Sequence, residues 1–121
     1  MQYFRMFADE NGDSHVEAME NTYELQDYAP PAPAFGISPA QGAERYVFVQ
    51  FPPNWTSELH PAPKRQLCVI LSGEFQGETS DGIVMDLKAG DMVLMEDTSG
   101  LGHKAKVIGD AEVLAMMIHL D

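Results

Sequence analysis

Two histidines and a glutamine are the residues of this chain whose types and spacing could do chemistry. His60 precedes an apolar run that begins near Gln66, and His103 follows at a distance, beyond a Gly90-Asp91 turn. Two imidazole nitrogens and a carbonyl oxygen can hold Fe, Mn, Ni, Cu or Zn and leave open positions for a substrate. The same side chains could instead line a metal-free pocket, in which hydrogen bonds satisfy each of them.

Strand alternation supports one shared pocket for the first group of residues. His60, Ala62 and Gln66 are separated by even steps, so an extended backbone directs their side chains to one face. The two prolines between them then face the other way, where no N–H donor is needed. Lys64 shares the parity of His60, so either the backbone is irregular there or Lys64 reaches solvent at the pocket mouth.

Other residues near these three could complete the site. Glu58, or Glu96 or Asp97, could add the negative charge that a divalent cation requires. Glu96 and Asp97 are adjacent and face opposite ways on a strand, so they form a poor acid/base pair. Trp55 is expected either to pack in the core or to form a wall of the pocket mouth. Arg65 is expected to point outward and to pair with an acidic neighbour.

The remaining histidines and the single cysteine have plainer interpretations. His15 and His119 lie in alternating segments at opposite ends of the chain, and we expect them at the surface or at an interface. Cys68 stands in an apolar run and is expected to be a small buried side chain. One cysteine cannot form an intrachain disulfide, which fits a reducing compartment.

The charge of the chain excludes several classes of partner. Seven Lys and Arg residues stand against nineteen Asp and Glu residues, giving a formal net charge of −12. A chain this acidic is repelled by the phosphates of nucleic acids and by anionic membranes. No segment reaches the roughly 20 apolar residues of a membrane span, and the first residues do not resemble a signal peptide, so we expect a cytoplasmic protein.

The elements that must position these residues are short β-strands. Alternation and turn dipeptides such as Asn11-Gly12 and Asp81-Gly82 dominate the sequence, and no helical period is sustained. The segment 23–28 is either a short strand or irregular. About nine strands in one 121-residue domain predict an all-β sandwich or closed barrel. The predicted strands are Gln2–Ala8, Ser14–Glu20, Arg45–Phe51, Arg65–Leu71, Glu74–Thr79, Ile83–Leu87, Met92–Glu96, His103–Ile108 and Glu112–Leu120.

A proline-rich segment interrupts this pattern between residues 29 and 39. It holds four of the eight prolines, so it cannot be an interior strand. We expect an ordered, extended segment that crosses the surface of the barrel or a partner subunit. Because sheet edges need covering, this segment and the N-terminal hairpin predict a homodimer.

From Trp55 to Val107 the chain resembles the cupin superfamily, small jelly-roll barrels that carry two motifs. In the first motif, His60 and Ala62 take the two His positions, Gln66 takes the Glu position and Gly73 the closing Gly. In the second motif Gly90-Asp91 matches, Glu96 replaces a Pro, and His103 takes the final His after a slightly longer loop. Only two of the four usual metal ligands are therefore unchanged.

The resemblance implies a single-domain jelly roll, or double-stranded β-helix, of the RmlC-like cupin type. The barrel core would span about residues 43–121, and residues 1–42 would pack on the barrel or on a partner. The proline-rich stretch and the 96–103 run are similar to those of small bacterial cupins of uncharacterised function. Three classes of function follow: a metal-dependent enzyme such as a dioxygenase or isomerase, a metal-free binder or sensor of a small molecule, and a structural barrel with a vestigial pocket.

Overall fold

The computed structural model describes all residues 1–121, which form eleven β-strands and no helix. Accordingly, no helix is present that is long and apolar enough to cross a membrane. Every predicted strand is present, six of the nine with the predicted ends and three with each end shifted by one residue. The strands are β1 (Gln2–Ala8), β2 (Ser14–Glu20), β3 (Glu24–Gln26), β4 (Phe35–Ile37), β5 (Arg45–Phe51), β6 (Gln66–Ser72), β7 (Glu74–Thr79), β8 (Val84–Lys88), β9 (Met92–Glu96), β10 (His103–Ile108) and β11 (Val113–His119).

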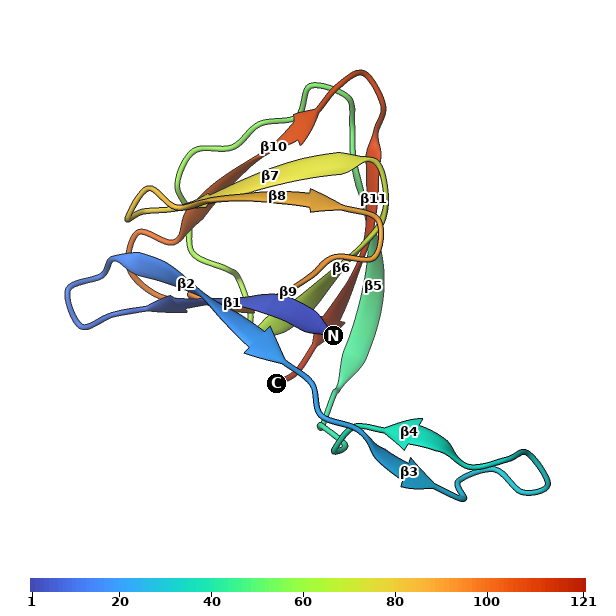
Figure 1. The fold of residues 1–121 in the computed structure, drawn as a ribbon. Helices are drawn as coiled ribbons and strands as arrows, with labels where there is room; N and C mark the ends of the chain where they lie inside the picture. The colour runs from blue at the N-terminus through green and yellow to red at the C-terminus, as the bar shows by residue number, and fades with distance from the viewer.

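Two facing sheets make up the body of the molecule (Figure 1). A six-stranded sheet has the order β2-β1-β9-β6-β11-β5, and a three-stranded sheet has the order β10-β7-β8. Neighbouring strands are antiparallel, except that β1 runs parallel to β9. The result is an all-β jelly roll in which the two sheets do not join into a closed hydrogen-bonded barrel.

Alternation along the strands explains which side chains lie between the sheets. On β11, Val113, Ala115 and Met117 are buried, whereas Leu114 between them is exposed. β8 alternates in the same way, with Met85 and Leu87 buried. The period of two residues in a strand therefore directs one set of apolar side chains into a shared core.

The N-terminal hairpin belongs to the large sheet. β1 and β2 pair along their whole length, and β1 adds to β9 through Phe4–Phe7. The turn between β1 and β2 contacts the loop before β10, where Leu101 N donates to Gly12 O at 2.8 Å. The hairpin is thus an integral part of the body that also reaches the loop carrying His103.

The proline-rich region forms an arm. β3 and β4 pair with each other over three residues each and make up a separate two-stranded sheet. This arm, residues 23–37, projects away from the two main sheets at the start of β5 (Figure 1). It therefore does not cross the surface of its own body, which was one of the two expected courses. β4 is a short strand that was not predicted, because it lies within the proline-rich segment.

Candidate functional site

A cavity of about 350 Å³ lies between the two sheets. Thirteen of its nineteen lining residues are hydrophobic, so its walls are mainly apolar. The polar side chains that line it are His60, Gln66, His103 and His119. The structure thus brings the predicted residues His60, Gln66 and His103 to one cavity, together with Trp55.

The two predicted histidines are neighbours. A β-bridge joins His60 to His103, and each backbone N donates to the other's O at 2.9 Å. Their ring centroids are 4.7 Å apart, with the planes inclined at 53°. Two segments distant in the sequence are therefore fixed to each other directly at the site.

Gly102 is the residue that permits this bridge. Its φ is +69°, a left-handed conformation that side chains disfavour, and a Cβ at this position would lie 2.0 Å from His60 O. The backbone of Gly102 therefore packs directly against that of His60. Only glycine allows the loop before β10 to approach so closely.

Each imidazole of the pair uses its Nδ1 to hold its orientation. The Nδ1 of His60 donates to Glu58 O at 2.9 Å, since a backbone carbonyl can only accept. The Nδ1 of His103 donates to Asp97 Oδ2 at 2.6 Å, and both residues are buried. In their neutral forms both rings therefore keep the Nε2 lone pair as a hydrogen-bond acceptor.

Gln66 and Ala62 lie near the pair but contribute differently. Gln66 is buried and its amide Nε2 contacts Met95 Sδ at 3.7 Å. Ala62 is packed in the core, where the resembled motif has a second histidine. Residues 61–65 do not form a strand, so the backbone is irregular between His60 and Gln66, and Lys64 is exposed. Because of this irregularity Pro63 also lines the cavity.

An aromatic cluster forms one wall of the cavity. Trp55 lies 4.8 Å from Phe51 and 6.0 Å from Phe75 between ring centroids, and Phe51 lies 4.6 Å from Phe75. All three line the cavity. Trp55 therefore packs against the core and lines the cavity at the same time, as both expected roles require.

His119 corrects our sequence interpretation. The expected surface residue lines the cavity, and its Nδ1 is buried without a hydrogen-bond partner. β11 pairs with β6 so that His119 stands opposite Gln66. The signal was available in the parity of β11, because His119 shares the phase of the core residues Ala115 and Met117.

The acidic residues considered as additional ligands do not line the cavity. Glu58 is exposed and contributes only its backbone carbonyl to His60. Glu96 accepts a hydrogen bond from Arg65 Nε at 2.5 Å and another from Arg5, which confirms an acidic partner for Arg65. Although burial acts in the opposite direction, these two arginines lower the pKa of Glu96.

Asp97 has a role that the sequence analysis did not assign. It is fully buried, and it orients the His103 ring. Its second oxygen, Oδ1, is buried without a partner. The carboxylate is thus used to position an imidazole and does not line the cavity itself.

A resident divalent metal does not fit these donors. No group of three His, Cys, Asp or Glu side chains is placed to hold an ion. The cavity is lined by three imidazoles, those of His60, His103 and His119, and by the neutral amide of Gln66, whereas Ala62 supplies no donor and no carboxylate lines the walls. The three imidazoles do not converge on one point, so an ion would lack the set of three protein ligands that catalytic zinc sites use.

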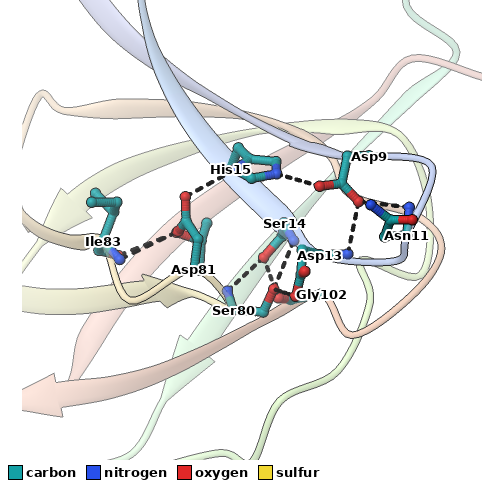
Figure 2. A network of polar contacts seen from close by, with 10 residues as sticks. Asp9, Asn11, Asp13, Ser14, His15, Ser80, Asp81, Ile83 and Gly102 are labelled. Atoms are coloured by element: carbon teal, nitrogen blue, oxygen red, sulfur yellow. Dashed lines mark hydrogen bonds and ion pairs between the residues drawn. The ribbon is translucent and has the colours of Figure 1, made fainter.

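A polar network anchors the loop that carries His103 (Figure 2). The buried Ser14 donates its Oγ hydrogen to Gly102 O at 2.5 Å and accepts one from Ser80 N at 2.7 Å. Beside it, His15 lies between Asp9 and Asp81, with ring nitrogens 2.6 and 2.9 Å from their carboxylates. The network links the β1–β2 turn, the β7–β8 turn and the site loop.

The comparisons with known proteins concern the fold. No protein-family model matches the sequence, and no curated protein matches it. Among solved structures, the cupin domain of CENP-C from Drosophila melanogaster superposes with a TM-score of 0.53 and 18% identity, over 83% of this chain and 75% of that one. The chain has the cupin fold. A protein described as ethanolamine utilization protein Q from Salmonella typhimurium gives a TM-score of 0.50 and 16% identity, over 99% of this chain and 95% of that one.

This likeness confirms the resemblance to cupins at the level of the fold. Identities of 18% and 16% do not extend to function, since one fold hosts many chemistries. What the cupin-fold protein does must therefore be argued from its own cavity.

Proposed function

We propose that this cupin-fold protein binds a small, mainly apolar organic molecule in its cavity without a resident metal. The observation that carries the proposal is a pair of oriented imidazoles, His60 and His103, set in a mainly apolar cavity of about 350 Å³. Mainly apolar pockets with a few convergent polar groups are the usual form of small-molecule sites.

The polar end of the ligand follows from the imidazoles. Because both Nδ1 atoms donate to protein oxygens, both Nε2 atoms are free to accept a hydrogen bond. A ligand hydroxyl would donate its hydrogen to one of them, whereas a ligand with only acceptors would leave both unpaired. A buried group left without its partner costs about 1–3 kcal/mol, enough to discriminate between such ligands.

The apolar end of the ligand follows from the aromatic wall. Phe51, Trp55 and Phe75 present ring surfaces to the cavity, and offset or tilted stacking on such rings stabilises a flat aromatic ligand. We therefore expect an aromatic or alicyclic alcohol to bind more tightly than an open-chain polar metabolite.

A matched pair of probes tests this proposal. Titration with 1-naphthol should change the fluorescence of Trp55, the single tryptophan, and 1-methoxynaphthalene, which lacks the hydroxyl, should bind roughly tenfold or more weakly. Ala105→Leu should block binding, because Ala105 lines the cavity two residues after His103. Val84→Thr, an exposed change on β8, is the control and should leave binding unchanged.

Metal analysis of untagged, freshly purified protein completes the test. We expect no near-stoichiometric Fe, Mn, Ni or Zn. A stoichiometric metal that is lost in both His60→Ala and His103→Ala would contradict the metal-free proposal. Equal affinity for the two naphthalene probes would contradict the role of the imidazoles.

A second candidate function is catalysis, and the Asp97–His103 pair favours it. A carboxylate that orients an imidazole by its Nδ1 leaves Nε2 placed to remove a proton from a bound molecule, as an isomerase requires. If a molecule copurifies with the protein, incubating the two together in D₂O should then introduce deuterium at a carbon of that molecule. This exchange should disappear in His103→Gln.

We also propose that the protein is a cytoplasmic homodimer. The single cysteine, Cys68, is buried, which suits a reducing compartment. Sedimentation velocity tests the dimer, which should have twice the 13.4 kDa protomer mass.

A further inference from the structure

His119 is a polar side chain of the cavity that the imidazole pair does not account for. Its ring lines the cavity, and its Nδ1 is buried without a hydrogen-bond partner. The backbone around it is fixed, because the carbonyl oxygen of His119 accepts from Glu44 N at 2.8 Å. The next residue, Leu120, donates its N–H to Arg65 O at 3.1 Å. The fold therefore holds this imidazole at the cavity wall.

The unpaired Nδ1 indicates which ring nitrogen of His119 carries the proton. A neutral imidazole has one N–H donor and one lone-pair acceptor. Among buried backbone groups, an N–H without an acceptor is rarer than an acceptor that lacks a donor. The same preference in the ring places the lone pair on the buried Nδ1 and the proton on Nε2. His119 is then a donor through Nε2, whereas His60 and His103 are acceptors through theirs.

The imidazoles lie at one end of the cavity and the aromatic wall lies at the other. In the small sheet, the last residue of β7 pairs with His103, whereas Phe75 stands four residues earlier, about 13 Å along the strand. In the large sheet, His119 ends β11, whereas Phe51 pairs with the first residue of that strand, about 20 Å away. Phe51 and Phe75 join the two sheets at the aromatic end, with ring centroids 4.6 Å apart. The donor on the large sheet therefore belongs to the same end of the cavity as the acceptor pair.

The charge of the cavity restricts the ligand group that His119 can bind. No lysine or arginine lines the cavity, so a carboxylate would be buried without a cationic partner. A carbonyl oxygen is a neutral acceptor and avoids this cost. The hydroxyl of a plain alcohol pairs with the acceptor end but offers the Nε2–H of His119 only a weaker and less accessible oxygen.

We infer that His119 selects ligands that carry a carbonyl oxygen as well as a hydroxyl, by donating from Nε2 to that carbonyl. The hydroxyl donates to His60 or His103 at the same time, and the apolar rings lie against the aromatic wall. The inference rests on the proposed function, because it assigns a second polar group to the same ligand. The ligand class is then a hydroxy-ketone or hydroxy-aldehyde on a flat ring system.

Two further naphthalene probes isolate the carbonyl. 3-Acetyl-1-naphthol and 3-ethyl-1-naphthol have nearly the same shape, and the meta arrangement prevents the hydroxyl from bonding to the carbonyl within the molecule. The wild-type protein should bind the acetyl probe roughly threefold to tenfold more tightly than the ethyl probe, as one additional hydrogen bond provides. Fluorescence titration of Trp55 measures both dissociation constants.

Substitutions at His119 test whether this residue is the donor. In His119→Phe, which keeps a flat ring, the preference for the acetyl probe should disappear. His119→Gln supplies a side-chain N–H again and should restore part of it. Val84→Thr, the exposed control on β8, should keep the full preference.

The outcomes separate this inference from the proposed function. If 1-naphthol itself does not bind, the proposed function fails and the role of His119 fails with it. If 1-naphthol binds but the acetyl and ethyl probes bind equally, only the role of His119 is overturned. Equal weakening of both probes in His119→Phe would also overturn it, because the ring would then support the cavity without reading the carbonyl.

The proton position can be measured without any ligand. Long-range ¹H–¹⁵N NMR at about pH 8, above the usual titration range of histidine, distinguishes a protonated ring nitrogen from a bare one. The His119 signals are those missing from His119→Phe. They should show the proton on Nε2, and a proton on Nδ1 would overturn the inference.

Discussion

Substituting Gly102 by alanine gives the sharpest test of how the site is built. The φ of +69° costs an alanine about 1–2 kcal/mol. The added Cβ would also lie 2.0 Å from His60 O, which is backbone and cannot rotate away. The two strands must therefore separate, and the pair of 2.9 Å hydrogen bonds between His60 and His103 is lost.

The expected magnitude follows from these two contributions. Two backbone hydrogen bonds contribute about 0.5–1.5 kcal/mol each. Added to the conformational cost, the loss in the free energy of unfolding is about 2–5 kcal/mol. Gly82→Ala is a matched control, because Gly82 has a φ of +89° but open space where its Cβ would lie. The difference between the two variants isolates the clash, at about 1–3 kcal/mol.

Urea denaturation followed by Trp55 fluorescence measures both variants under the same conditions. Gly102→Ala should also weaken the binding of 1-naphthol, because His103 moves with the displaced loop, whereas Gly82→Ala should not. If both variants lose the same free energy of unfolding, the close approach of Gly102 to His60 is not what fixes the histidine pair.

Three further predictions follow from individual residues. Hydrogen bonds to Asp9, and to a lesser extent to Asp81, raise the pKa of His15. The stability that protonated His15 adds is therefore complete below about pH 6.5 and is lost as the pH rises through the raised pKa. The Tm difference between wild type and His15→Gln should shrink from pH 6 to pH 9, and a constant difference would exclude the charged contact. Burial raises the pKa of Cys68 to about 12, so a thiol reagent at pH 8 should label it only after unfolding, and rapid labelling of the folded protein would show that the cavity is open there. Asp97→Ala leaves the buried Nδ1–H of His103 without an acceptor and should cost about 1–3 kcal/mol in urea denaturation, with a loss near zero arguing that water replaces the carboxylate.

The fold was predictable because local signals agree with it. Alternation in segments such as 113–119 and turn signals such as Asp81-Gly82 locate strands without reference to the rest of the chain. β4 was not predicted, since its three residues follow a run of prolines that cannot donate to a ladder. Its pairing with β3 joins two segments of three residues each, which are too short to show alternation in the sequence.

The candidate site was predictable only where motif and alternation agree. His60 and His103 follow from the motifs, but the parity rule between His60 and Gln66 did not apply, because residues 61–65 are irregular. For His119 the rule did apply, and its position near the end of the chain led to the wrong interpretation as a surface residue. Alternation is therefore informative only within a continuous strand, and there it outweighs position in the sequence.

The apolar run of β6 includes residues on both faces of the strand, although only one face is buried within a single chain. A strand that is apolar at consecutive positions is typical of a sheet covered on both faces. In this protein Cys68 and Ile70 fill the inner face, whereas Leu71 is 46% exposed on the other. A sequence selected only for the interior would alternate apolar with polar residues there, as β10 does with Lys104 and Lys106. The departure from alternation on β5, β6 and β11, and not on β10, distinguishes the sheet face that the proposed homodimer would cover from the sheet that faces water.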